Sequence, residues 1–433
     1  MTRGVRPRLE GKEKTPLSSR VATGVSWSPL SDQKGIGFAL LTAACVGEFE
    51  SPWPDALQLL SVNAVYPAGY ASAVHEGAVI RIEEVSSGAA YLARTDSRGL
   101  AEIQVPPGIY RITCSDRSGK DLFNGAADKV VVTERRIVDL LLSHSTAGGL
   151  VVKEIYCGGC SKAPQEGTYQ SDQYFIIHNN DFEPVYLDSL CFGTLSPYNS
   201  TSVNNWTERD PVTGETVFPD FAPVVTVVWQ LPGSGKDFPL APGADAVVAL
   251  RGAIDHTLQY PLSVNLNLPD VFTCYNPTYF PNPTYHPAPG DQVKPERYAQ
   301  VVIKTGQSNA NTFSISSPTV VLFRTPMPAG EYVQQEDVVR VTPGNSADRV
   351  VVVPYEWILD AVEVFDGRSS ANGKRISPAA DAGFVIQSDV FKGHTLRRKV
   401  DETASAENGY EVLMDTNNSS NDFYESEIQS LHP

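Results

Sequence analysis

The chain has 433 residues, of which 41% are hydrophobic, and its formal net charge is −16. Because an acidic surface repels phosphate groups, the composition argues against nucleic acid or an anionic membrane face as a partner. The length suggests two or three domains that are large enough to bury hydrophobic cores. With 33 glycines, 32 prolines and only three methionines, the sequence favours turns and strands over long helices. No stretch keeps a helical apolar period for three turns and no repeat stands out, so we predict an all-β protein.

A short apolar run, GIGFALLTAA at residues 35–44, lies between Lys34 and Cys45. A basic residue, an apolar segment of about ten residues and small residues before a cysteine are typical of a bacterial lipoprotein signal. The run is too short to cross a membrane as a helix, and its end, LTAAC, resembles a lipobox. The resemblance implies a leader and signal at residues 1–44, lipid on Cys45, a linker at 45–56 and anchorage in the outer membrane. The polar segment before Lys34 is unusual for a signal and indicates a later translation start, and the alternative is a buried apolar segment followed by chance by a cysteine.

The segments at 57–67, 77–85, 90–116 and 129–142 alternate apolar and polar residues between turn signals, which is the pattern of half-buried strands. In the turn TDSRG, an aspartate can bond its own backbone and the glycine can take a positive φ. The order of a strand, TDSRG and AEIQVPPGIYRI resembles the transthyretin-like, carboxypeptidase-regulatory-like β-sandwich. The resemblance implies a seven-stranded spacer or contact module over residues 57–145, without catalysis.

Three side chains of this first region carry separate expectations. Cys114 follows Ile112 on one face of a strand, so we expect it to be a buried free thiol. His75 and His144 lie outside the predicted strands, and we expect both to be solvated.

Residues 149–426 contain VVKEIYCGG, DQYFIIHNNDFEPVYLDSLCFG and FPLAPGADAVVAL. These segments resemble the opening strands and the hairpin of a lamin-tail-type domain, and TVVLFR, WILDAVEVF and the segment at 396–423 resemble its later strands. The resemblance implies an immunoglobulin-like β-sandwich. Long insertions near 193–220 and 255–300 depart from the compact pattern of that family.

The whole chain, with its lipobox, small β-sandwich and lamin-tail-like domain, is similar to an uncharacterised family of outer-membrane lipoproteins of the Bacteroidota. Those lipoproteins are commonly associated with TonB-dependent receptors. The resemblance implies an extracytoplasmic binding or accessory protein whose partner is an outer-membrane transporter or another surface protein. An adhesin or surface-assembly component is the alternative, and a glycan- or peptide-acting enzyme with an unrecognised carboxylate pair is a third hypothesis.

Cys157 and Cys160 enclose two glycines, and three interpretations compete for them. A zinc site needs two more ligands at workable spacing, and no second Cys-x-x-Cys exists. A redox site needs a helix that lowers the thiol pKa, but the pair enters the turn SKAPQEGTY. Because two glycines let the chain fold back until the two Cα atoms come within bonding range, we predict a disulfide that shapes a loop.

The segment CYNPTYFPNPTYHPAPGDQ at 274–292 is dense in aromatic residues and prolines. Long irregular loops in compact domains are often functional, and rigid aromatic faces bind peptides or sugars at low entropic cost. We therefore predict a ligand- or partner-binding surface at Tyr275, Tyr279 and Tyr285. The alternative is a loop that covers an exposed sheet edge.

Two further motifs are weaker. The segment LPGSGKDF at 231–238 lacks the residues of a phosphate-binding loop, so we predict a turn between strands. The segment DTNNSSNDFYESE at 415–427 offers oxygen ligands but lacks the glycine and glutamate positions of an EF-hand loop, which leaves open whether calcium binds near Asp415–Asp422. The sequence also lacks G-x-S-x-G and H-E-x-x-H, so we expect no cofactor, no metal and no enzymatic activity.

Overall fold

The computed structural model describes residues 57–70, 76–118, 121–146, 149–212, 214, 216–306 and 309–432. Cys45, the predicted signal and linker, and His75 lie outside these ranges. The fold is mostly β, with several sheets and few short helices, which confirms the predicted all-β class. Among the described helices, none combines the length and the hydropathy that a membrane span requires.

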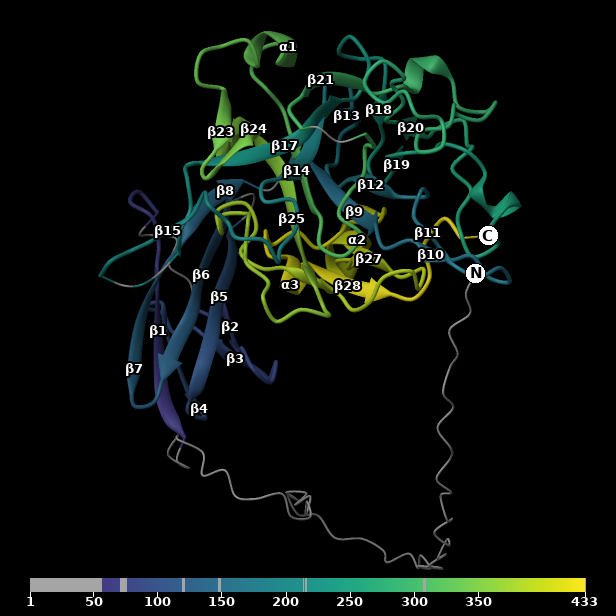
Figure 1. Ribbon diagram of the computed structural model, residues 1–433. Coiled ribbons are helices and arrows are strands. Elements are labelled where there is room, and N and C mark those ends of the chain that lie inside the picture. Colours follow the sequence, from purple (N-terminus) through teal and green to yellow (C-terminus); the bar gives the residue numbers. More distant parts are fainter. Residues whose placement is uncertain are drawn as a thin grey trace, which may run out of the picture. The chain divides into compact units, whose positions relative to one another are not determined.

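Residues 58–146 form two sheets, drawn in purple to blue in Figure 1. A three-stranded sheet has the order β4-β1-β7 and a five-stranded sheet has the order β3-β2-β5-β6-β8. Both sheets contribute to one cluster of buried apolar side chains, so they pack as a sandwich. The strands are β1 (Gln58–Val65), β2 (Val79–Glu84), β3 (Ala90–Arg94), β4 (Leu100–Val105), β5 (Gly108–Ser118), β6 (Asp121–Val132), β7 (Arg136–Leu141) and β8 (Ser143–Thr146).

The turn between β3 and β4 forms as its sequence predicts. The Asp96 carboxylate accepts from the backbone N–H groups of Arg98 and Leu100 at 2.9 and 3.0 Å, and Gly99 has a φ of +83°.

Cys114 is a fully buried free thiol, as expected. The expectation for His144 was wrong, because β8 is an eighth strand that the sequence reading missed. The His144 ring stacks on Tyr70 with centroids 4.3 Å apart, and His144 Nε2 lies 2.7 Å from an Asp121 carboxylate oxygen, so this histidine is packed and paired instead of solvated.

Residues 150–426 form a second, larger sandwich. One sheet has the order β20-β19-β12-β9-β27-β28, and the other has the order β23-β24-β17-β14-β22-β25-β26 with β21 paired to β17. The strands of the first sheet are β9 (Leu150–Tyr156), β12 (Tyr174–Asn179), β19 (Asp245–Ala249), β20 (Phe272–Thr273), β27 (Thr395–Arg398) and β28 (Phe423–Ser426). Those of the second are β14 (Cys191–Leu195), β17 (Phe221–Gln230), β21 (Gln300–Lys304), β22 (Thr319–Phe323), β23 (Val339–Thr342), β24 (Asn345–Pro354), β25 (Ile358–Asp366) and β26 (Val385–Gln387).

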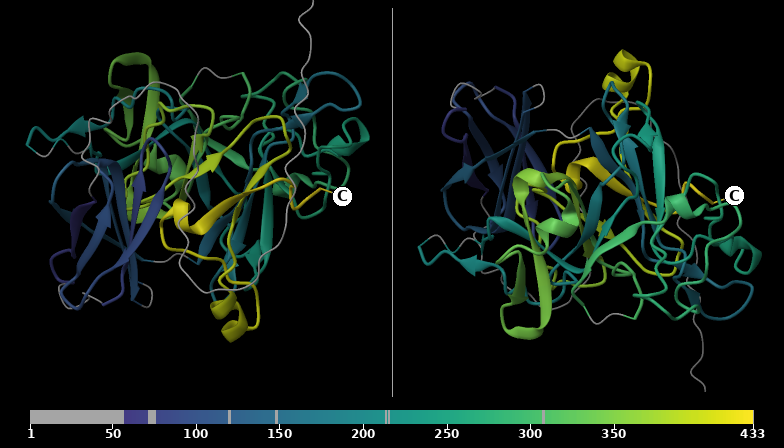
Figure 2. Two further views of the ribbon diagram at one scale, coloured as in Figure 1. Left: turned by 90° about the horizontal axis from the view of Figure 1, so that it is seen from below. Right: turned by 90° about the horizontal axis from the view of Figure 1, so that it is seen from above.

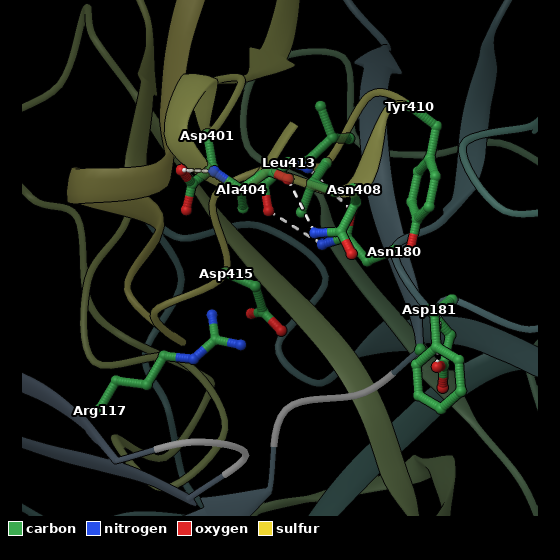
Figure 3. Close-up of a pocket in the computed structure, with 12 residues that line it drawn as sticks. Arg117, Asn180, Asp181, Asp401, Ala404, Asn408, Tyr410, Leu413 and Asp415 are labelled. Carbon is green, nitrogen blue, oxygen red and sulfur yellow. Dashed lines mark hydrogen bonds between the residues drawn. The ribbon is translucent and has the colours of Figure 1, made fainter. Parts of the chain in front are cut away.

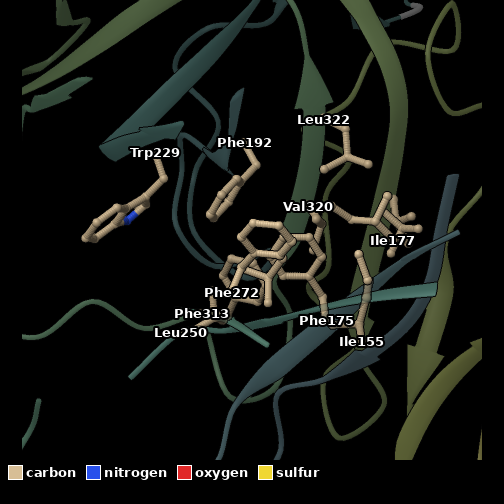
Figure 4. Packing of buried hydrophobic residues seen from close by; sticks show 14 of the residues in the cluster. Ile155, Phe175, Ile177, Phe192, Trp229, Leu250, Phe272, Phe313, Val320 and Leu322 are labelled. Atoms are coloured by element: carbon tan, nitrogen blue, oxygen red, sulfur yellow. The ribbon is translucent and has the colours of Figure 1, made fainter. Parts of the chain in front are cut away.

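The core of the larger sandwich lies between these two sheets. Figure 4 shows Phe175 and Ile177 of β12 facing Phe192 of β14 and Leu322 of β22. The rings of Phe175 and Phe192 meet edge to face with centroids 5.1 Å apart. Both central strands, β12 and β14, are buried along their whole length.

The remaining elements are short. Three strand pairs are β10 (Cys160–Ser161) with β11 (Thr168–Tyr169), β13 (Val185–Tyr186) with β18 (Pro239–Leu240), and β15 (Glu208–Arg209) with β16 (Thr216–Val217). The helices are η2 (His256–Leu258), η3 (Pro295–Arg297), α1 (Ala329–Tyr332), η4 (Tyr355–Trp357), α2 (Glu402–Asn408) and α3 (Ser419–Asp422). Both views of Figure 2 show α2, in yellow, protruding at one end of the larger sandwich.

The small sandwich contacts the larger one through β5. The Arg111 guanidinium lies 4.5 Å from the centroid of the Phe384 ring, which in turn stacks on Phe365 at 4.1 Å. The Asn418 amide donates to the Ser115 hydroxyl at 3.1 Å. One strand of the small sandwich therefore packs against the closing segments of the larger one.

A buried ion pair joins the two sheets of the larger sandwich. Arg398 on β27 is 4% exposed and Asp360 on β25 is 2% exposed. Arg398 Nη2 lies 2.5 Å from Asp360 Oδ2, and the same oxygen accepts from the Val152 N–H of β9 at 2.6 Å. Arg398 Nε donates to the Val152 carbonyl at 2.8 Å. Because the pair is also hydrogen-bonded on both sides, its charges are satisfied inside the core.

We expect Arg398→Met to destabilise the protein by about 3–5 kcal/mol, because it leaves the Asp360 carboxylate buried without its cation. Arg398→Met combined with Asp360→Leu should recover part of that loss. Denaturant unfolding measures both, with Arg98→Met as the control, since Arg98 forms an exposed pair with Asp96. A loss below about 1 kcal/mol for Arg398→Met would contradict a structural role for the pair.

Candidate functional site

The tyrosine-rich segment lies in the long insertion between β19 and β21. It contains a six-residue repeat that the sequence reading missed: NPTYFP at 276–281 is followed at once by NPTYHP at 282–287. The two copies differ only at the fifth position, where the first has phenylalanine and the second has histidine. We call these segments the tyrosine turns.

Each tyrosine turn begins with an asparagine that organises the residues after it. In the first, Asn276 Oδ1 accepts from the Thr278 N–H at 3.1 Å, and the Asn276 carbonyl accepts from the Phe280 N–H at 2.9 Å. In the second, Asn282 Oδ1 accepts from the Thr284 N–H at 2.9 Å, and the Asn282 carbonyl accepts from the fifth residue at 2.9 Å. Asparagine forms such turns readily because its side chain imitates a backbone carbonyl. The repeat in sequence is therefore a repeat in structure.

The fifth residue of each tyrosine turn fixes it to the core. Phe280 is 1% exposed and stacks on Trp229 with ring centroids 5.9 Å apart. His286 is 2% exposed, and its Nε2 accepts from the Asn311 N–H at 2.7 Å. The rings of Phe280 and His286 also contact each other at 4.9 Å. The two turns thus share one anchor inside the larger sandwich.

The fourth residue of each tyrosine turn lies on the surface. Tyr279 is 43% exposed and Tyr285 is 44% exposed. The backbone carbonyl of each tyrosine accepts a hydrogen bond from a cationic side chain. Lys304 Nζ donates to the Tyr279 carbonyl at 3.2 Å, and Arg251 Nε donates to the Tyr285 carbonyl at 3.4 Å. The Arg251 guanidinium also lies 5.6 Å from the Tyr285 ring centroid. The two tyrosines therefore have similar exposure and similar backbone support, although Lys304 Nζ lies 4.8 Å from the centroid of the Phe280 ring and not over Tyr279.

Tyr275, the third residue predicted for this surface, is placed differently. It precedes the first tyrosine turn, is half-buried, and meets Tyr298 edge to face at 5.5 Å. The structure therefore gives Tyr279 and Tyr285 matched positions in the repeat, whereas Tyr275 packs against Tyr298. The spacing of the two NPTY segments is the sequence signal that separates the pair from the third tyrosine.

Burial and two nearby cations determine the charge of His286. Burial is the larger cause, and with Arg251 and Lys304 it lowers the pKa of His286 to about 4. The ring is therefore neutral at neutral pH and accepts the Asn311 N–H. Protonation would place a charge in the anchor and remove that acceptor.

The disulfide predicted between Cys157 and Cys160 is absent, because both are buried free thiols. Cys157 Sγ donates to Gln387 Oε1 at 2.8 Å, and Cys160 Sγ lies 3.7 Å from an Asp172 carboxylate oxygen. Burial raises the pKa of both thiols, that of Cys160 to about 12, which is the opposite of redox activation.

The two glycines between these cysteines serve close packing instead of ring closure. A Cβ on Gly158 would lie 2.0 Å from the Gln387 amide nitrogen, and a Cβ on Gly159 would lie 2.1 Å from the Tyr169 carbonyl oxygen. Gly159 also has a φ of +71°. The two glycines between the cysteines are therefore explained by the close approach of Gln387 and of the Tyr169 carbonyl, which leave no space for a side chain.

The segment at 231–238 is a turn, as predicted. Its backbone N–H groups do not face an open anion site, because the Asp188 carboxylate accepts from Gly235, Asp237 and Phe238 at 2.8–2.9 Å. A protein carboxylate thus occupies the place that a bound phosphate would take.

The acidic segment near the C-terminus supplies partners for Arg398. Asp422 and Asp415 lie 3.5 and 3.6 Å from Arg398 Nη1, and Asp422 also accepts from the Thr416 N–H and hydroxyl. Burial raises the pKa of Asp422 to about 7 and that of Asp360 to about 6. In the part of the chain that the structure describes, no three His, Cys, Asp or Glu side chains are grouped as metal ligands. These carboxylates therefore serve the ion pair.

Comparison with known proteins adds a family of unknown function. Residues 241–430, which include both tyrosine turns, match the model of DUF4876, described as a protein of unknown function. The crystal structure of a DUF4876 family protein from Bacteroides thetaiotaomicron VPI-5482 is 23% identical, covers 85% of this chain and 94% of its own, and superposes with a TM-score of 0.51. Part of this chain is thus similar to DUF4876, and its fold resembles that of the Bacteroides protein.

Other comparisons carry no argument. The Bacillus anthracis TIE protein is 12% identical, with 44% of this chain and 32% of its own covered and a TM-score of 0.16. The major pilin subunit BcpA of Bacillus cereus is 10% identical, with 71% and 95% covered and a TM-score of 0.16. No curated protein matches the chain.

The lowered pKa of His286 predicts an acid-sensitive anchor. A histidine whose folded pKa lies below its unfolded value of 6.5 contributes stability that is complete above pH 6.5 and is lost as the pH falls toward 4. We expect the wild-type protein to lose up to ~3 kcal/mol more than His286→Gln between pH 6.5 and 4. Denaturant unfolding across this range measures the difference, with His394→Gln as the control histidine. Parallel pH profiles for wild type and His286→Gln would contradict the assignment.

Proposed function

We propose that this protein is a lipid-anchored, extracytoplasmic binding or accessory protein that holds an outer-membrane transporter or another surface protein. The pair of tyrosine turns is the observation that carries the proposal. Tyr279 and Tyr285 are exposed to nearly equal degrees, while the residue after each is fixed in the core. The repetition of an exposed tyrosine above an anchored residue supports a binding role for this surface.

The physical advantage of this arrangement is a low entropic cost of binding. A tyrosine has only two side-chain torsions to fix, and a backbone held by asparagine turns and a shared anchor loses little freedom when a partner binds. The rings offer apolar faces and the hydroxyl groups offer hydrogen bonds, which is the combination typical of interface hot spots. The insertion therefore suits a contact with a partner better than a cover for a sheet edge.

Two other parts of the proposal, the lipid anchor at Cys45 and the class of partner, are supported by the sequence and not by the tyrosine turns. The lipobox-like segment before Cys45 supports a lipid anchor, and the resemblance to lipoproteins associated with TonB-dependent receptors supports a transporter as the partner. The fold shared with the Bacteroides thetaiotaomicron protein adds no function, because that similarity concerns structure alone. The absence of catalysis and of a cofactor remains a prediction.

The binding surface is tested by replacing both exposed tyrosines. Tyr279→Ala combined with Tyr285→Ala should weaken retention of the co-purified partner by at least tenfold, since each ring is expected to contribute ~2 kcal/mol as a hot spot. Detergent extraction of native membranes followed by a pull-down measures retention. The melting temperature should stay nearly unchanged, because the anchoring residues are intact.

Tyr424→Ala is the matched control, because Tyr424 is 45% exposed and lies on β28. Tyr275→Ala should have a smaller effect than either tyrosine of the turns. If the double variant retains the partner as well as Tyr424→Ala does, the interface lies elsewhere. Hydrolysis of a glycan or peptide with no partner retained would favour the enzyme hypothesis instead.

The lipid anchor is tested by the mass of protein extracted from membranes. We expect the chain to begin at Cys45, with 44 residues removed and lipid added, and Cys45→Ser to leave the membrane fraction. A soluble chain that starts at Met1 would contradict the anchor while leaving the tyrosine surface open to its own test.

A further inference from the structure

A second region of the molecule has the features of a ligand site and shares no residue with the tyrosine turns. It is a pocket of about 360 Å³ beside α2, where the end of β5, the loop after β12 and the segment at 401–415 meet (Figure 3). Pockets of this size hold small molecules or single side chains of a partner. The residues that line it are Arg117, Gly149, Asn180, Asp181, Phe182, Asp401, Ala404, Asn408, Tyr410, Val412, Leu413 and Asp415.

Two polar atoms that face this pocket are buried and lack a hydrogen-bond partner. They are Asp415 Oδ1 and the Tyr410 hydroxyl oxygen. Asp415 as a whole is only 4% exposed, and Arg398 Nη1 lies 3.6 Å from Oδ1, beyond hydrogen-bond distance. Arg117, the arginine of the pocket, points toward Asp415 (Figure 3). A buried polar atom without a partner costs about 1–3 kcal/mol. Two such atoms lining one pocket indicate that a bound group supplies the missing partners.

Other polar groups of the pocket already have partners. The Asn180 side chain exchanges two hydrogen bonds with the Leu413 backbone, at 2.8 and 2.9 Å, and the Asp401 carboxylate accepts from the Ala404 N–H at 3.0 Å. These bonds hold the loop after β12 and the start of α2 in place. Asp415 and Tyr410 are therefore the positions at which a ligand gains new hydrogen bonds.

The charges of the pocket favour a cation. Its lining contains three aspartates and one arginine, so its formal charge is negative. Behind Asp415, the positive charge of Arg398 is divided among Asp360, Asp422 and Asp415 itself, so it compensates the Asp415 charge only in part. A carboxylate oxygen only accepts hydrogen bonds when it is ionised, so the partner of Asp415 must be a donor. An ammonium or guanidinium group supplies both the donor and the charge.

The apolar part of the lining favours an aliphatic chain behind that cation. Phe182 is 66% exposed at the pocket, and Val412 and Ala404 add further apolar surface. A ring with this exposure can cover the methylene groups of a lysine or arginine side chain, which bury their stems against apolar surface while the charged end finds its partner. The pocket thus combines an apolar wall with an acidic end.

We propose that this pocket binds a protonated amine or guanidinium carried on an aliphatic chain, with Asp415 as the anionic acceptor and Tyr410 as the second polar contact. A free small amine and a lysine or arginine side chain of a partner protein present the same chemistry. The inference does not depend on the tyrosine turns or on lipidation, so its failure leaves the proposed function standing.

The test measures binding of N-acetyl-lysinamide and N-acetyl-norleucinamide to the full chain by calorimetry or ligand-observed NMR. The two probes have the same stem, and only the first has an ammonium group. We expect saturable binding of the lysine probe with a Kd on the order of 1 mM, and norleucine binding at least tenfold weaker. An acetylated Gly-Lys-Gly amide that binds more tightly than the lysine probe would identify a partner side chain as the source, and equal binding would identify a free amine.

Variants place the binding in this pocket. Asp415→Asn should weaken lysine binding at least tenfold, and Tyr410→Phe should weaken it several-fold without changing the fold. Asp270→Asn is the control, because the Asp270 side chain is 90% exposed and lies outside the pocket. Should Asp415→Asn lower the melting temperature strongly, Tyr410→Phe alone decides the question. Equal affinity for both probes, no saturation by any of the probes, or unchanged binding in Tyr410→Phe and Asp415→Asn would overturn the proposal.

Discussion

The larger sandwich depends on a charge that its core has to accommodate. Arg398 reaches from β27 across the space between the sheets to Asp360 of β25, and both residues also bind the backbone of β9. A buried guanidinium is stable only where several acceptors surround it in fixed positions. The segment at 415–422, which follows β27, meets this requirement with Asp422 and Asp415. The chain after β27 therefore has to return to the buried end of Arg398.

This constraint also explains where the molecule can vary. The two sheets and the ion pair form a rigid frame, and the long insertion between β19 and β21 is attached to it through Phe280 and His286. The insertion has little regular secondary structure, yet its backbone is ordered by asparagine turns and by two cations. Loops of this kind carry recognition because the frame positions them without depending on their exposed residues.

Much of the fold could be predicted from the sequence, because alternation and turn chemistry are local. The strands of the small sandwich and the turn at Asp96 and Gly99 follow from neighbouring residues, whereas β8 is too short to leave a pattern. The Cys157–Cys160 interpretation failed because the neighbour that needs Gly158 is Gln387, 229 residues later in the chain. The pocket at Asp415 was equally hidden: the sequence drew attention to Asp415 as a possible calcium ligand, but not to Asp181 or Asp401, and it could not show which oxygen lacks a partner.

The tandem organisation of the tyrosine turns makes them modular. Each copy has its own asparagine turn and its own inward residue, while Lys304 and Arg251, which lie outside the repeat, bind the two tyrosine carbonyls. Duplication or deletion of one unit would change the valency of the surface while the strands on either side keep their register. Because paired weak contacts add their free energies within a single encounter, a six-residue change in length could alter affinity by orders of magnitude. The insertion is therefore a place where binding strength can evolve separately from the stability of the fold.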